Sequence, residues 1–160
     1  MWRVTGFTYI ELLVTMVIMG LISIAVLPRA PGLGVEAGPE VEQLAADLRY
    51  VQMRSMNDGA RFCLSVSANS YSLSTAASGC TVPLVSAGGI MSPVTLRDAQ
   101  LVTSGLPGTV IVFDGMGTPY GSAAPSAVAL TSPIVFTLTV AGVTRSVTVS
   151  PVTGMVVASP

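Results

Sequence analysis

The sequence predicts an α+β protein in which two helices precede an antiparallel β-sheet domain. An apolar run from Phe7 to Leu27 is long enough for a helix of about 30 Å. A second stretch, 39–57, repeats apolar residues at helical spacing, and from Arg61 onward apolar and polar residues alternate as in strands. At 160 residues the chain fits one domain plus an anchor segment.

The composition argues against a nucleic-acid-binding protein. Charged residues make up 9% of the chain, compared with roughly 25% in an average soluble protein. All seven basic residues are Arg, and beyond residue 29 five Arg stand against seven acidic residues. A basic patch of the kind that binds phosphate backbones is therefore absent, and we expect no nucleic-acid partner.

The residues that catalysis needs are also missing. With no His and no Lys in the chain, an acyl-transfer triad has no base. No phosphate-binding glycine loop precedes a helix. Asp98 and Asp114 stand alone in turn-like sequence, so we expect them to cap turns rather than to form a paired-carboxylate or calcium site. The sequence therefore predicts a protein that is not an enzyme and binds no metal or cofactor.

Glu11 is the one charged residue inside the apolar run. A charge deep in a membrane helix costs about 2.5–3.5 kcal/mol, which favours a functional role with a named partner. The alternative is that interface water and the positive end of the helix dipole make a carboxylate near the helix start tolerable. The apolar run and its one acid leave both interpretations open.

The residues around Glu11 resemble the N-terminal signature of type IV prepilins and type II secretion pseudopilins. Gly6 is followed by Phe7 and then by Thr-Tyr-Ile-Glu-Leu-Leu. The resemblance implies that a prepilin peptidase removes residues 1–6 by cutting between Gly6 and Phe7, and that the new Phe7 amine is N-methylated. It also implies that residues 7–29 remain as a transmembrane and assembly helix, in which Glu11 pairs with the Phe7 amine of a neighbouring subunit.

A break separates this helix from the rest of the chain. Residues 28–39 hold three prolines and three glycines, which disfavour helix. In pilins a proline often occupies the position equivalent to Pro28, where it kinks or locally melts the long helix. Here the break is heavier, and we expect a linker at 30–38 and a globular domain at 39–160. The resemblance places the leader in the cytoplasm and the domain in the periplasm, as a single-pass protein of the bacterial inner membrane.

The second helix is amphipathic and begins near Pro39, which suits a first turn. Its apolar positions recur at helical spacing: Val41, Leu44, Ala45, Leu48 and Val51. Its acidic residues lie early and its Arg residues late, which complements the helix dipole: Glu40, Glu42, Asp47, Arg49 and Arg54. We expect the Arg-bearing part to be a solvated face, and Asn57-Asp58-Gly59 to end the helix.

Strand candidates follow at 62–66, 71–75, 82–85, 93–96, 100–103, 110–113, 134–140, 144–149 and 155–158. The clearest hairpin is the late one, with its turn at Ala141-Gly142, and 123–133 is expected to be a loop. Cys63 and Cys80 are the only cysteines, and an even pair in an exported domain favours a disulfide. The alternative is two buried free thiols.

The element order narrows the resemblance to minor pseudopilins of the GspH/FimT type. The residues that carry it are the Phe113-Asp-Gly-Met-Gly turn, Arg145 in the late hairpin and the terminal Thr153-Gly154. It implies a sandwich-like type IV pilin fold. Its partners would be other pilin or pseudopilin subunits, prepilin peptidase, and the inner membrane with its assembly platform.

Several functions stay open at this point. The filament system could be a type II secretion pseudopilus, a type IV pilus, an MSHA-type pilus or a competence apparatus. The alternatives to a structural subunit are a DNA-uptake minor pilin and a membrane-anchored periplasmic binding domain that does not polymerise.

Overall fold

The computed structural model describes residues 8–26, 38–97, 99–124 and 126–159. The chain separates into two units, Met1–Val35 and Glu36–Pro160. In the first unit, α1 (Tyr9–Val26) covers most of the apolar run. Within the described ranges, no helix has both the length and the apolar character that crossing a membrane requires. The predicted linker at 30–38 lies outside the described residues except for Gly38, which begins the second helix.

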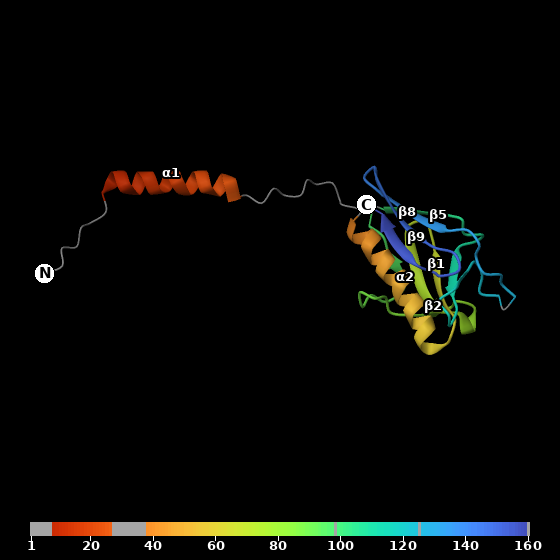
Figure 1. Cartoon of the computed structure of the whole chain (residues 1–160). Coiled ribbons are helices and arrows are strands. Elements are labelled where there is room, and N and C mark those ends of the chain that lie inside the picture. The colour runs from red at the N-terminus through yellow and green to blue at the C-terminus, as the bar shows by residue number, and fades with distance from the viewer. Residues whose placement is uncertain (1–7, 27–37, 98, 125, 160) are drawn as a thin grey trace. The chain divides into compact units, whose positions relative to one another are not determined.

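The second unit packs one long helix, α2 (Gly38–Asp58), against two antiparallel sheets (Figure 1). A short 3-10 helix, η1 (Ala76–Ser78), follows the first hairpin. The strands are β1 (Phe62–Val66), β2 (Ser70–Thr75), β3 (Val82–Pro83), β4 (Val94–Thr95), β5 (Ala99–Ser104), β6 (Val110–Phe113), β7 (Pro119–Tyr120), β8 (Ile134–Val140), β9 (Val143–Val149) and β10 (Val156–Ser159).

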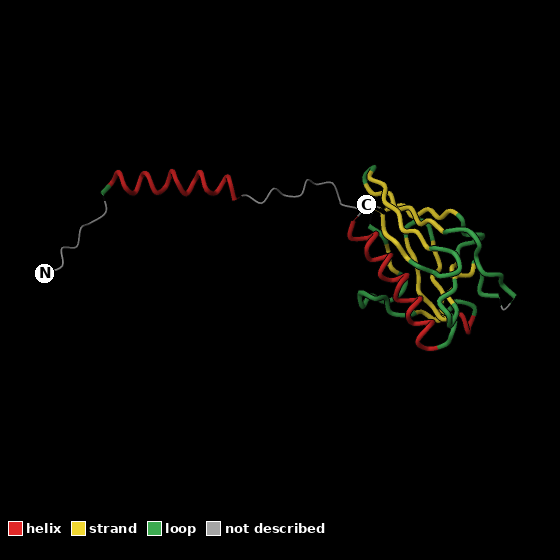
Figure 2. The backbone as a smooth tube through the Cα atoms, in the orientation of Figure 1, coloured by secondary structure: helices red, strands yellow, loops and turns green. Residues whose placement is uncertain are grey.

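One sheet has the order β3-β2-β1-β6-β7, with β4 also paired to β2, and the other has the order β10-β9-β8-β5. Figure 2 shows the strands of this unit in yellow beside the helix. Every strand pairing is antiparallel. The predicted α+β class with antiparallel sheets is therefore confirmed.

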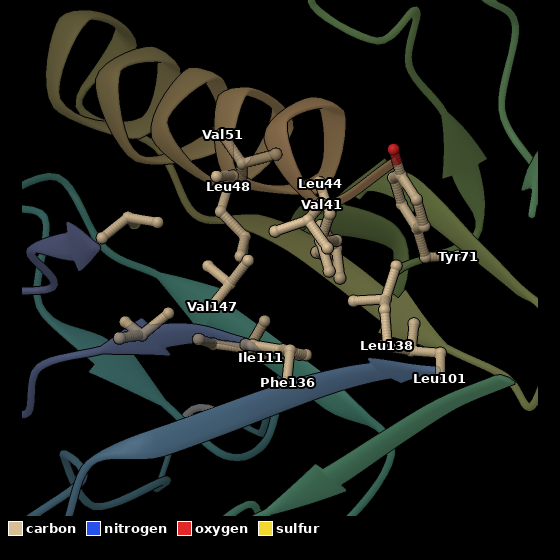
Figure 3. Packing of buried hydrophobic residues seen from close by; sticks show 14 of the residues in the cluster. Val41, Leu44, Leu48, Val51, Tyr71, Leu101, Ile111, Phe136, Leu138 and Val147 are labelled. Atoms are coloured by element: carbon tan, nitrogen blue, oxygen red, sulfur yellow. The ribbon is translucent and has the colours of Figure 1, made fainter. Parts of the chain in front are cut away.

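The apolar face of α2 covers the core, because the helix packs on β1 and β6 of one sheet and on β9 and β10 of the other. Figure 3 shows side chains from the helix and from the strands below it meeting in this core: Val41, Leu44, Leu48, Val51, Ile111, Phe136, Leu138 and Val147. Burying each such aliphatic side chain stabilises the fold by about 1.5–3 kcal/mol. Gly59 follows the helix with a φ of +61°, the left-handed conformation that commonly ends helices.

The late hairpin follows the prediction most closely. β8 has the predicted bounds, and β9 begins one residue earlier than expected. Ala141 and Gly142 between them have φ values of 48° and 82°, as a tight two-residue hairpin turn requires. The short elements were predicted less well. β3 and β4 are only two residues long, and Pro93, which cannot donate to a ladder, lies just before β4. The short elements η1 and β7 were not predicted at all.

Candidate assembly site

Glu11 lies in the first turn of α1, among exposed apolar side chains. A stripe at helical spacing runs past it: Ile10, Leu13, Val14, Val17 and Ile18. The positive end of the helix dipole favours a carboxylate in this turn. No described residue forms a hydrogen bond or ion pair with the Glu11 side chain. The apolar stripe and the carboxylate therefore lie together on a surface that a second molecule can contact.

Three other residues singled out by the resemblance lie outside the described residues. These are Gly6 and Phe7, assigned to cleavage and N-methylation, and Pro28, assigned to the helix break. Their roles stay predictions.

α2 also presents exposed apolar side chains at the edge of its buried face. Met53 is 65% exposed and Met56 53% exposed. Together with Tyr50, Arg54 and Asn57 they line an open hollow of about 510 Å³. Methionine side chains adapt readily to a partner that they meet, so this hollow is a candidate contact surface. We call these five residues the α2 outer patch.

Gln52, also on α2, hydrogen-bonds to two turns that lie far apart in the sequence. Its Nε2 donates to the carbonyl oxygen of Gly117 at 3.2 Å and to that of Thr153 at 2.9 Å. Gly154 packs against the same place, where a Cβ atom would overlap the Gly117 carbonyl oxygen. The Phe113–Gly117 turn and the Thr153-Gly154 pair, which suggested the GspH/FimT type, thus meet at α2.

Comparison with known proteins rests on the fold. No protein-family model matches the sequence, and no curated protein matches it at a significant level. Two crystal structures of the type IV minor pilin FimU of Pseudomonas aeruginosa PAO1 match the coordinates, in space groups P21 and P65. The first match has a TM-score of 0.52 at 14% identity and covers 78% of this chain and 89% of that one. The second has a TM-score of 0.51 at 13% identity and covers 77% and 92%. The chain has a type IV pilin-like fold.

Within this pilin-like fold, Asp47 is a buried carboxylate whose burial was not predicted from the sequence. Its side chain is fully buried, where Oδ2 accepts the Tyr71 hydroxyl and Oδ1 accepts the Ala87 N–H, both at 2.6 Å. Burial and the hydrogen bond to Asp47 raise the pKa of Tyr71 far above its usual value. The expectation from the sequence grouped Asp47 with the early acidic residues of the helix and did not include the burial of its side chain. Its spacing of three from Leu44 and four from Val51 was the signal for an inward position.

Asp114 behaves as the sequence predicted. Its Oδ1 accepts the backbone N–H groups of Met116 and Thr118, both at 2.9 Å, and Oδ2 accepts the Tyr120 hydroxyl at 3.0 Å. The carboxylate therefore closes the turn after β6. Asp98 lies outside the described residues. Across the described ranges, no group of three or more His, Cys, Asp and Glu side chains is arranged to hold a metal ion.

The predicted disulfide between Cys63 and Cys80 is confirmed. Their Cα atoms are 5.8 Å apart, and neither cysteine is free. Cys63 is fully buried in β1, and Cys80 lies two residues beyond η1. The bond therefore fastens the chain that leads into β3 onto the middle of its sheet.

Proposed function

We propose that this protein is a minor pilin or pseudopilin, a structural subunit that enters, primes or caps a type IV pilus or a type II secretion pseudopilus. The observation that carries the proposal is the combination of a pilin-like globular fold with an N-terminal helix that bears one carboxylate, Glu11, beside exposed apolar side chains. A similar fold belongs to FimU, a type IV minor pilin.

The assembly mechanism uses the same apolar surface twice. Before assembly, residues 7–29 are held by the lipid of the bacterial inner membrane, and the domain from 39 onward lies in the periplasm. After prepilin peptidase has removed residues 1–6, the helix exchanges lipid for the helices of other subunits. In that apolar environment Glu11 pairs with the N-methylated amine of Phe7 on a neighbour. Breaking one side of such a buried pair costs about 3–5 kcal/mol, so the pair sets the register between subunits.

The α2 outer patch adds a second contact in the same proposal. The helix buries one stripe in its own core and leaves Met53 and Met56 exposed, next to Tyr50, which is half-buried against the core. Packing the α2 outer patch against a neighbouring subunit would remove these apolar side chains from water. In a filament the patch is covered by a helix of the next subunit.

The mature N-terminus tests the processing step. We expect mass spectrometry of the protein from its native membrane to find a chain that begins with methylated Phe7. An intact Met1, or cleavage beyond residue 27, would sink the proposal and favour an anchored periplasmic domain that does not polymerise.

Substitution of Glu11 tests the charge pair. Glu11→Ala should leave membrane insertion intact, because it removes a costly charge, yet reduce the amount of protein recovered in sheared filaments at least about tenfold. Glu42→Ala, which removes an exposed acid from α2, is the matched control and should be incorporated normally. Recovery of the Glu11→Ala protein at wild-type level would refute the pairing.

A further inference from the structure

The outer face of the β1–β2 hairpin is lined with serine hydroxyls. Leu64 and Leu73 point into the core, and the alternate positions hold Ser65, Ser72 and Ser74. Ser65 lies directly opposite Ser72 across the ladder. Residues opposite each other in an antiparallel pair share a face, so these hydroxyls gather on one side of the sheet. Figure 1 shows β1 and β2 side by side in this sheet.

Two neighbouring hollows lie over this serine face and share two lining residues. The larger has a volume of about 360 Å³ and is lined by Ser72, Ser74, Ser92 and the rings of Pro83 and Pro93, among others. The smaller, of about 100 Å³, is lined by Ser65 together with Ser72 and Pro93, which belong to both hollows. We call these two neighbouring hollows the serine groove. Besides serine hydroxyls and prolines, their lining includes Val66, Tyr71, Leu73 and Cys80.

The chemistry of the lining selects a class of ligand. No charged side chain lines either hollow, and residues 62–96 contain no Asp, Glu, Lys or Arg. An ionic ligand would therefore lose its hydration without gaining a counter-charge. A serine hydroxyl both donates and accepts hydrogen bonds, as the hydroxyl groups of a sugar do. The proline rings offer apolar walls to the C–H faces of such a ligand. We propose that this groove binds a neutral saccharide.

Two of the serines have unused hydrogen-bonding capacity. Ser74 is only 3% exposed, and its Oγ has no hydrogen-bond partner among the described residues. Buried hydroxyls are nearly always satisfied by protein, water or ligand, so the Ser74 hydroxyl, in the lining of the larger hollow, lacks the partner that such a group usually has. Ser92 Oγ accepts the Leu73 N–H at 2.7 Å, which fixes its position and leaves its own hydrogen to donate.

An added peptide strand is a poorer occupant, because the outer edge of β2 is already used. β3 pairs with Ser74 and Thr75, and β4 pairs with Ser70 and Tyr71. Between them, the Leu73 N–H is taken by Ser92, and its carbonyl accepts the Leu84 N–H at 2.8 Å. Strand addition needs a row of free backbone groups, and this edge does not provide one.

The test is a titration of the full-length, ¹⁵N-labelled protein in zwitterionic micelles that contain no sugar detergent. Glucose, galactose and N-acetylglucosamine are the probes. We expect at least one of them to produce saturable amide shifts, with a Kd in the millimolar range, confined to the N–H-bearing residues that line the two hollows: 65–67, 70–74, 80–81 and Ser92. Glucuronate and glucose 6-phosphate should bind more weakly than the neutral sugars. No saturable shift with any neutral sugar, or tighter binding of the charged ones, overturns the proposal.

Matched variants locate the site. Ser72→Val fills the junction of the two hollows and should weaken binding at least about tenfold. Ser65→Val, at the rim of the smaller hollow, is the second variant if Ser72→Val does not fold. Ser146→Val, on β9 of the other sheet and also half-buried, is the control and should bind as the wild type does. Equal binding by wild type and the groove variants, or an equal loss in Ser146→Val, refutes the groove as the site.

Discussion

Gly154 is constrained by its backbone and its neighbours together. Its φ is +66°, and a Cβ atom there would overlap the Gly117 carbonyl oxygen. Gly142 has a similar φ, +82°, but open space around it. We expect Gly142→Ala to lower the free energy of unfolding by about 1–2 kcal/mol. Gly154→Ala should cost about 1–3 kcal/mol more, because steric overlap adds to the strain. Urea unfolding measures both, and equal losses would contradict the contact between the two turns.

Tyr71 gives the fold a dependence on alkaline pH. Its pKa is raised by burial and by the hydrogen bond to Asp47. Because the folded pKa lies above the unfolded value of about 10, this contribution to stability is complete below about pH 10 and is lost as the pH rises further. We expect the free energy of unfolding of the wild type to fall above that pH, and that of Tyr71→Phe to fall less steeply.

Tyr120→Phe is the control for this experiment. Hydrogen bonding to Asp114 raises the pKa of Tyr120 as well, but this side chain is only half-buried, so solvent screens the effect. Its removal should change the alkaline slope less than removal of the Tyr71 hydroxyl. The same slope in the wild type and in Tyr71→Phe would show that Tyr71 is not responsible.

At the scale of elements, α2 organises the globular unit through polar contacts as well as through its apolar face. Asp47 holds the loop at Ala87, and Gln52 holds the turns at Gly117 and Thr153. Arg49 adds a bond to the carbonyl oxygen of Val156 at 3.2 Å. Each such bond contributes only about 0.5–1.5 kcal/mol, but leaving one partner buried and unpaired costs about 1–3 kcal/mol. One helix thereby positions loops from three parts of the chain.

The Cys63–Cys80 disulfide fixes the segment that leads into β3 against β1. Removing it in the double variant Cys63→Ala/Cys80→Ala should lower the free energy of unfolding by about 3 kcal/mol, since it closes a loop of 17 residues. In the wild type, thiol labelling of denatured, unreduced protein should find neither cysteine reactive. Stoichiometric labelling of both cysteines would mean that the bond does not form in the cell.

At the scale of the whole molecule, the Arg side chains of the described part are largely engaged within the fold. Arg54 pairs with Asp58 at 2.7 Å, and Arg61 lies over the Tyr120 ring, 4.9 Å from its centroid. DNA binding needs cations that are free to replace the counterions of phosphate. The net charge of −1 gives no attraction over longer distances either.

We therefore expect the full-length protein to bind duplex DNA only non-specifically, with a Kd at or above about 10⁻⁴ M at physiological salt. A gel-shift assay in a neutral detergent measures this, with Arg145→Ala as the variant, because Arg145 is the one cation of the late hairpin. Low-micromolar affinity that is lost in Arg145→Ala would contradict the prediction and favour a subunit of a DNA-uptake apparatus.

Local sequence patterns were enough to locate most of the elements. The alternating run 134–140 forms β8, and the apolar positions between 41 and 55 form the inner face of α2. Apolar residues that recur every two or every 3.6 positions show which face of a strand or helix is buried. This holds for any packing partner, so the pattern predicts the element without knowledge of the fold. β7 was not predicted, because two residues show no periodicity and are defined as a strand only by their pairing with Val112 and Phe113.

The polar contacts of α2 and the serine groove depend on segments that meet only in the folded chain. Asp47 finds its backbone partner 40 positions away, and Gln52 finds one of its partners 101 positions away. Glu11 could be singled out from the sequence because its neighbours in the chain are themselves the apolar environment. For Asp47 the spacing indicated an inward position but not how the carboxylate would be satisfied there. The cost of burying it depends on whether a hydroxyl and an N–H from other elements lie beside it, and that is settled only when the sheets and loops close over the helix.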